Sequence, residues 1–361
     1  MKEFLNRKKN LWIIALLLLA IIKLFSLDRE RVEVFYTSEF YFTFSKILRF
    51  LFGWIPFSFG DILYLLAACW LLWKLVKNII LLFKKELKGK LLFKKIFKLF
   101  VGLAFIYIIF NIFWGLNYNN KGIANELGLQ KTAIDTSDVL TLQSLLLEKV
   151  NLSKTTLMHK RFSYPDKKEL FKRAEKCYIE SEKKYPFLVY KIPSLKSSLY
   201  GWWGNYLGFT GYYNPFTGEA QVNTTVPEFL QPYIATHEMA HQIGYAKENE
   251  ANFAGYLAGV NSTDTLFHYS CYLDLYIYAN HQVFYFDSAA SKKSRELLIP
   301  AVKKDLEEWR QFSISHQSFI EPAINWMYGN YLKLNEQPRG MYSYNQVISM
   351  LIAYYKKFGK I

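Results

Sequence analysis

The sequence predicts an α+β protein that is mostly helical, with N-terminal transmembrane helices followed by a domain that carries a small β-sheet. Three observations predict this fold class. Long apolar runs lie in the first third of the chain, apolar residues recur at helical spacing through most of the remainder, and one stretch rich in glycine and aromatic residues carries turn signals. We therefore divide the 361 residues into a membrane domain, residues 1–116, and an extracytoplasmic domain, residues 117–361.

The membrane domain is predicted from three apolar runs, at about residues 11–27, 62–83 and 96–116. Each run holds about 20 residues, which in a helix is enough to cross a hydrocarbon core of about 30 Å. Lys23 lies near the end of the first run, where its ammonium group can extend toward the interface. We expect this run to be an uncleaved anchor, since it shows neither the shorter apolar core nor the small-residue cleavage site of a signal peptide.

Basic residues predict how the chain faces. The N-terminus and the loop KKELKGKLLFKK between the second and third runs are both rich in lysine or arginine. The positive-inside rule places both in the cytoplasm, so residues after Leu116 lie on the outer side of the cell (inner) membrane, in the periplasm or outside the cell. The apolar stretch 36–59 fits either an interfacial amphipathic helix or a short re-entrant segment, and both interpretations stay open.

The formal charge of +15 does not indicate a nucleic-acid partner. Residues 1–116 hold 18 Lys and Arg against 7 Asp and Glu, so most of the excess lies beside apolar runs, as in a protein whose partner is the lipid bilayer. No basic module or aromatic stacking platform is present in the sequence. The three cysteines are widely spaced and form no disulfide framework or cysteine-based zinc cluster, so we expect buried thiols.

The outer domain is predicted to be mainly helical, with strands in one region. Two or three short strands are expected between Ser197 and Asn223, the last at Glu219–Asn223, and a helix follows from Pro227 to Gly244. Helical spacing predicts further helices at 137–158, 166–185, 248–260, 264–286, 300–318, 322–334 and 344–358.

The most informative residues are His237-Glu238-Met239-Ala240-His241, within the helix expected after Pro227. Positions i and i+4 share one helix face, so both imidazoles can reach a single Zn²⁺ ion. Glu238 is about 100° further around the helix, where it suits a general base acting on water rather than a ligand. The spacing predicts a zinc site with one ion per chain.

A catalytic zinc ion usually has three protein ligands and one open position. A turn at Gly244 followed by a second helix could return a carboxylate to the metal. Glu248 is the preferred third ligand, with Asn252 four residues later placed to orient a ligand. Glu250, on another side of the same helix, remains the alternative.

The HEMAH segment with ENEAN downstream resembles the gluzincin metallopeptidases, in which the third ligand is the glutamate of Glu-x-x-Ala-Asp or a close relative. This sequence has asparagine in place of the final aspartate, and the acidic segment follows the second histidine sooner than in most gluzincins. The whole chain also resembles a family of bacterial three-span membrane proteins of uncharacterised function, most specifically over residues 211–253. The resemblance implies a zincin-like fold for the outer domain and gives no substrate.

Other residues are candidates for binding substrate or stabilising the transition state. Zincin-like folds use an edge strand to hold an extended peptide, and we assign this role to the segment Gly211–Asn223, through the strand residues Glu219, Ala220, Gln221, Val222 and Asn223; a purely structural hairpin is the alternative. Tyr344, with Tyr342 and His281 as other candidates, could donate to a developing oxyanion.

These expectations combine into one function. The sequence predicts a membrane-anchored zinc metallopeptidase that hydrolyses envelope proteins or peptides, with Glu238 activating the water. The alternative is a catalytically inactive membrane scaffold or binding protein that keeps a zincin fold. The sequence does not determine substrate, cleavage preference or oligomeric state.

Overall fold

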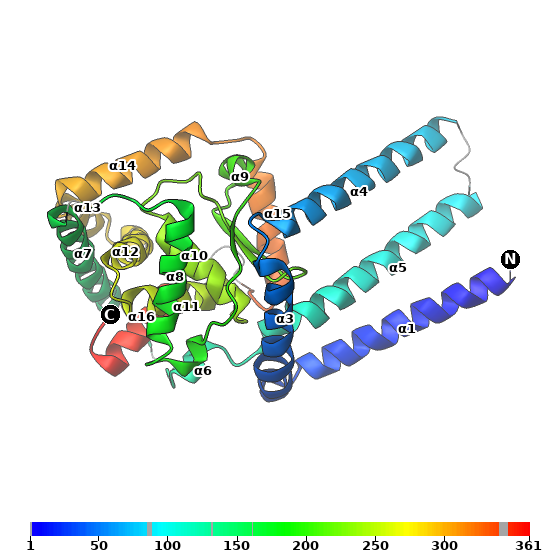
Figure 1. Ribbon diagram of the computed structural model, residues 1–361, viewed down its shortest axis with the longest axis horizontal. Helices are drawn as coiled ribbons and strands as arrows, with labels where there is room; N and C mark the ends of the chain where they lie inside the picture. Colours follow the sequence, from blue (N-terminus) through cyan, green and yellow to red (C-terminus); the bar gives the residue numbers. More distant parts are fainter. Residues whose placement is uncertain (1, 85–88, 131–132, 161, 339–345) are drawn as a thin grey trace.

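The structure, a computed structural model, describes residues 2–84, 89–130, 133–160, 162–338 and 346–361. Within these residues the protein is mostly helical, with one small three-stranded sheet. Three long helices project together from one side of a folded body, and the C-terminus lies in that body (Figure 1). This arrangement confirms the predicted class of a mainly helical α+β protein preceded by apolar helices.

The projecting helices are α1 (Lys2–Ser26), α4 (Phe59–Phe83) and α5 (Gly89–Phe113). By length and composition, α4 and residues 91–113 of α5 can each cross a membrane, and α1 gives a third crossing if it is taken with the bent helix that follows it. The protein therefore has two or three apolar helices of membrane-spanning type. Near the end of α1, Lys23 Nζ lies 3.9 Å from Glu336 Oε1 in the body, so this lysine extends toward a polar partner.

Most of residues 36–59, for which two interpretations were open, lie in a helical segment that packs on the body. The chain passes through α2 (Arg29–Arg31), the π-helix η1 (Val32–Tyr41) and α3 (Phe42–Gly53), bent by 97° from α1. Figure 1 shows α3 lying across the ends of the projecting helices. The Tyr36 hydroxyl donates to the backbone carbonyl of Ile112 at 3.0 Å, which ties this helix to the end of α5.

The helices predicted after residue 116 are confirmed within a few residues of their expected bounds. They are α7 (Thr136–His159), α8 (Lys167–Ser181), α11 (Glu248–Val260), α12 (Thr265–Phe286), α14 (Pro300–Ser315), α15 (Glu321–Leu334) and α16 (Gln346–Phe358). Aspartate side chains cap three of the N-termini, at Asp135, Asp166 and Asp264. Shorter helical elements were not predicted: η2 (Gly115–Asn119), α6 (Ile123–Glu126), η3 (Pro186–Leu188), α9 (Gly201–Leu207) and α13 (Ser288–Glu296).

The sheet contains β1 (Leu195–Ser197), β2 (Gly211–Asn214) and β3 (Glu219–Val222) in the order β1-β3-β2. β1 pairs parallel with β3, and β2 pairs antiparallel with it. β2 and β3 lie where short strands were predicted, whereas β1 lies almost entirely before that region. The edge position assigned to Glu219–Asn223 is wrong, because β3 is the central strand with neighbours on both sides.

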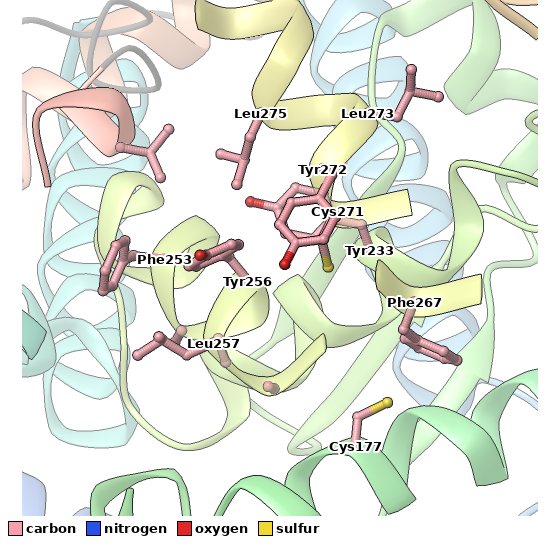
Figure 2. Packing of buried hydrophobic residues seen from close by; sticks show 14 of the residues in the cluster. Cys177, Tyr233, Phe253, Tyr256, Leu257, Phe267, Cys271, Tyr272, Leu273 and Leu275 are labelled. Carbon is pink, nitrogen blue, oxygen red and sulfur yellow. The ribbon is translucent and has the colours of Figure 1, made fainter. Parts of the chain in front are cut away.

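The core lies between the helices of the body. Aromatic side chains such as Phe253, Tyr256 and Phe267 fill the space between α11 and α12 without exposure to solvent (Figure 2). Cys177 and Cys271 are buried free thiols, as expected, and burial raises the pKa of Cys177 to about 12. Cys69 differs from the prediction, since it is exposed on α4, an apolar helix whose surface suits lipid.

Candidate metal centre

The centre is built on α10 (Gln231–Gln242), which begins four residues later than predicted. Pro232 occupies the first turn, where its missing N–H costs no helical hydrogen bond. The helix ends at Gln242, and the chain turns two residues later at Gly244, whose φ of 104° favours glycine. The amide of Gln242 donates to the carbonyls of Ser194 and Gly218, at 3.1 and 2.7 Å, which holds the last turn of α10 against the sheet region.

The next helix, α11, crosses α10 very closely. A Cβ atom built on Gly255 would lie 2.9 Å from the backbone nitrogen of His237, which leaves no room for a side chain. Glu248 is the first residue of α11, and this close crossing turns its carboxylate toward the histidines of α10.

Three potential ligand atoms gather at this crossing. His237 Nε2 lies 3.3 Å from Glu248 Oε2, and His241 Nε2 lies 3.7 Å from the same oxygen. All three ligand atoms lie within 4.8 Å of one another. The two measured separations are close to the roughly 3.4 Å that neighbouring ligand atoms keep around a tetrahedral ion with bonds of about 2.1 Å. Two imidazoles and a carboxylate also match the donor preference of zinc, so these residues fit the ion.

Hydrogen bonds orient two of the three groups. His241 Nδ1 lies 2.7 Å from the carbonyl oxygen of Tyr245, which leaves Nε2 free to face Glu248. The Tyr328 hydroxyl donates to Glu248 Oε1 at 2.5 Å, so the other carboxylate oxygen faces the histidines. His237 Nδ1 is buried and has no hydrogen-bond partner within the described part of the chain. The nearby Asp274 interacts with this histidine electrostatically; burial raises the Asp274 pKa to about 7, and the charge of His237 opposes the rise.

The charges in the centre are strongly coupled. Burial opposes ionisation of His241, but its hydrogen bond and charge interaction with Glu248 outweigh that effect and raise its pKa to about 9. Burial likewise opposes ionisation of Glu248, but the two histidines hold its pKa well below the usual value. The buried Glu248 carboxylate therefore attracts positive charge. A metal cation could supply that charge in place of protons.

Glu238 lies beside the three groups and does not join them. Its side chain is 4% exposed, and its Oε2 atom has no hydrogen-bond partner among the described residues. Burial raises its pKa to about 7, with the positive charges of His237 and His241 opposing this rise. A carboxyl group with this pKa can both accept and release a proton near neutral pH.

Comparison with known proteins gives one match. A family model described as a protein of unknown function, DUF3810, matches residues 36–352. The chain belongs to the DUF3810 family. No curated protein and no solved structure matches it. The DUF3810 match includes α3, the sheet and every residue of the centre described above, and it begins after the end of α1.

The structure distinguishes the two glutamates of this DUF3810 chain that were candidates for the third ligand. Glu248 joins His237 and His241, whereas Glu250 lies 3.2 Å from Lys247 Nζ and against Gly122. The Asn252 amide was expected to orient a ligand, but Tyr328 contacts Glu248 instead. The Asn252 Nδ2 atom is buried without a partner in the described residues.

The strand residues assigned to substrate binding are buried or hydrogen-bonded within the protein. All of Glu219–Val222 is buried in the central strand, and Asn223 donates its amide to the carbonyl of Gly201 at 3.0 Å. Glu219 accepts hydrogen bonds from the backbone N–H groups of Phe59 and Gly60, so it holds the start of α4. Tyr344 and Tyr342 lie outside the described residues. His281 is exposed and lies 3.4 Å from the Tyr285 hydroxyl.

Three further residues surround the centre. Tyr328 and Trp114 were not predicted, and Gly211 was named only as the start of the segment assigned to substrate binding. The Trp114 ring lies 5.9 Å from that of His241, and a Cβ atom on Gly211 would lie 2.4 Å from Glu238 Oε1. Gly211 and Trp114 come from segments with many glycines and aromatics, and Tyr328 is one of 27 tyrosines. No local spacing distinguishes them, because their contacts depend on the tertiary fold.

Proposed function

We propose that this chain is a membrane-anchored zinc-dependent metallopeptidase that hydrolyses peptide bonds of envelope proteins or peptides. The observation that carries the proposal is the grouping of the His237, His241 and Glu248 ligand atoms within 4.8 Å, beside the buried carboxyl group of Glu238. In this proposal the body is a zincin-like domain on the outer side of the membrane, and the N-terminus is cytoplasmic.

Each residue of the centre has a distinct role in the proposed reaction. His237, His241 and Glu248 would hold one Zn²⁺ ion, which when bound supplies a Lewis acid for the scissile carbonyl. Glu238 takes a proton from the attacking water and later gives it to the departing amine, and its pKa of about 7 suits both transfers. Tyr328 holds the Glu248 carboxylate in its ligating orientation.

The edge strand β2 supports a place for the peptide. β2 lies at one edge of the sheet, and its first residue, Gly211, directly adjoins Glu238. An extended peptide that pairs with a strand edge gains main-chain hydrogen bonds independently of its sequence. In this proposal β2, rather than the central strand β3, holds the substrate beside the proton-transferring carboxyl group.

The metal part of the proposal is tested by the zinc content of the purified full-length protein. We expect one zinc per chain in the wild type and in Glu250→Ala, and loss of zinc in His237→Ala and Glu248→Ala. The Glu250→Ala variant is the matched control, because it removes a neighbouring carboxylate from the same helix turn. A folded wild-type protein without zinc would overturn the proposal.

The catalytic part is tested with Glu238→Gln, which keeps the size of the side chain and removes its proton-accepting carboxylate. A peptidase variant of this kind keeps its zinc and loses turnover by several orders of magnitude. If instead the variant supports the cellular role of the protein as well as the wild type does, the chain is a scaffold that keeps the fold without catalysis.

A further inference from the structure

Two helices of the body present exposed apolar faces in the part of the chain that the structure describes. On α3 the exposed residues Ile47, Phe50, Leu51 and Trp54 follow the i, i+3, i+4, i+7 spacing of one helix face, and Trp54 is 77% exposed. On α15, Ala323, Trp326, Met327 and Leu334 form a similar exposed stripe. Exposed apolar stripes of this kind mark interaction surfaces in water, and they are also the lipid-facing side of interfacial helices.

A third element, α9, adds two further exposed aromatic side chains. Trp202 and Trp203 on this short helix are 54% and 60% exposed. The Ser318 hydroxyl, just before α15, donates to the carbonyl of Tyr206 on α9 at 2.6 Å, so the two elements are neighbours. Tryptophan is the residue most typical of the membrane–water interface, where its ring and its N–H meet different surroundings.

All three elements lie at the ends of the membrane-type helices. Only residues 54–58 separate α3 from α4. The backbone N–H of Leu199, just before α9, donates to the Asp61 carboxylate in the first turn of α4 at 2.8 Å. Tyr331 on α15 packs against Phe110 of α5, with ring centroids 6.3 Å apart. Figure 1 shows α3 and α15 lying across the ends of α1, α4 and α5.

The apolar faces are therefore continuous with surfaces that already suit lipid. None of the most apolar part of α4 is buried within the protein, so lipid is the natural cover for that helix. The exposed apolar faces of α3, α9 and α15 lie beside the end of α4 that joins the body, at the depth where a bilayer changes from hydrocarbon to head groups. We propose that these faces rest in the membrane interface and hold the metal centre at the bilayer surface.

The position of the metal centre adds a substrate class. Tyr328, on the inner side of α15, contacts Glu248, and Trp114, one residue after α5 ends, contacts His241 through its ring. One helix, about 10 Å thick, thus separates the centre from the apolar face of α15. On the basis of the proposed peptidase function, the substrates are juxtamembrane segments of proteins anchored in the same membrane, rather than peptides free in solution.

The membrane contact is tested without any activity measurement. Full-length protein with Cys69→Ser is placed in phospholipid vesicles, and a nitroxide is attached at Phe50→Cys, Trp203→Cys or Trp326→Cys. Glu308→Cys, on the exposed side of α14, is the control. We expect the three test positions to collide more with oxygen, which concentrates in lipid, than with a water-soluble nickel chelate, and the control to show the reverse.

Two results would overturn the membrane contact. Test positions as accessible to the nickel chelate as Glu308→Cys would place these faces in water. Test positions shielded from both reagents would mean that protein, such as a second copy of the chain, covers them.

The substrate class is tested in the same vesicles with two pools of test proteins. Each pool carries a randomised segment of about 10 residues, placed either directly after a transmembrane anchor or after a flexible spacer of about 40 residues, which moves it roughly 35 Å away. We expect the zinc-loaded wild type to cleave the membrane-proximal pool at least about tenfold faster, and Glu238→Gln to cleave neither. Equal cleavage of both pools would overturn the substrate class and leave the peptidase intact. Absence of cleavage from both would overturn the peptidase and its substrate class, while the nitroxide data still decide the membrane contact.

Discussion

At the scale of single residues, the centre is asymmetric. Glu248 uses both carboxylate oxygens, one toward the two histidines and one toward Tyr328. His241 likewise uses both ring nitrogens, since its Nδ1 meets the carbonyl of Tyr245. His237 has no such support within the described residues, so the orientation of the ligand set depends most on the contacts of Glu248 and His241.

Tyr328→Phe tests this dependence. The change removes one hydroxyl and leaves the ring, so Glu248 loses the hydrogen bond that directs its second oxygen. Loss of such an outer contact typically weakens metal binding by about 10- to 100-fold. We expect a corresponding rise in the zinc dissociation constant, measured by competition with a chromophoric chelator. Tyr285→Phe, which removes an exposed hydroxyl elsewhere, is the control; equal affinities in the two variants would contradict the role of Tyr328.

The sequence predicts contacts between residues that lie close together in the chain. His237 and His241 are one helical turn apart, and Glu248 follows after a single turn of the chain, so their meeting could be predicted from spacing. Tyr328 reaches Glu248 across 80 residues, and its contact depends on how α15 packs. The choice of Tyr328 over Asn252 was therefore beyond sequence spacing alone.

At the scale of helices and strands, the centre depends on close backbone approach. α11 can bring Glu248 to α10 only because Gly255 has no side chain to separate the two helices. Gly211 allows the same closeness between β2 and Glu238. These glycines therefore allow three elements to meet around one point.

Gly255→Ala should push α10 and α11 apart by a few tenths of an ångström. The new methyl group would meet the backbone of His237, which cannot rotate away, and overpacking of this kind costs about 1–3 kcal/mol. We expect a lower melting temperature for the zinc-free protein and weaker zinc binding. Gly102→Ala is the control, because a Cβ atom there would meet nothing within 4 Å. If both variants melt and bind zinc alike, the close crossing is not needed.

Glu219→Ala separates a structural role from a substrate role. The change leaves the buried N–H of Gly60 and that of Phe59 without their acceptor, at a cost of about 2–3 kcal/mol. We expect the urea midpoint to fall while the KM for peptides and the zinc content stay unchanged. Removal of the exposed Glu307 in the same assay should change the midpoint little. An increased KM with unchanged stability would instead support the predicted contact with substrate.

Glu219 also shows which feature of the sheet could not be predicted from residue alternation and turn signals. They predicted a strand at Glu219–Asn223, and the structure has β3 there. Strand order depends on β1, whose residues pair with β3 residues 25 positions later in the chain, such as Leu195 with Ala220, and local sequence contains no sign of that pairing. For this reason the strand was predictable and its central position was not.

At the scale of the whole molecule, charge and shape agree on one arrangement. The end of α4 at Phe83 and the start of α5 at Gly89 lie at the side of these helices that is farthest from the body (Figure 1), and the sequence beside both is rich in lysine. Basic residues at that end favour the cytoplasm, so the positive-inside rule predicts that the body lies on the outer side. In the proposed arrangement, a positively charged end of the apolar helices is separated from a body whose exposed apolar faces rest on the membrane.

This orientation predicts the accessibility of single cysteines in cells from which any outer membrane has been removed. In a Cys69→Ser background, Glu308→Cys on the body should react with a membrane-impermeant maleimide in intact cells. Lys84→Cys, at the end of α4 far from the body, should react only after permeabilisation, because the reagent cannot reach the cytoplasmic side of an intact membrane. The Cys69→Ser chain without an added cysteine, whose remaining thiols are buried, should stay unlabelled in both conditions. The reverse pattern would place the metal centre in the cytoplasm, where envelope proteins could not reach it, and the peptidase would then need substrates on the cytoplasmic face.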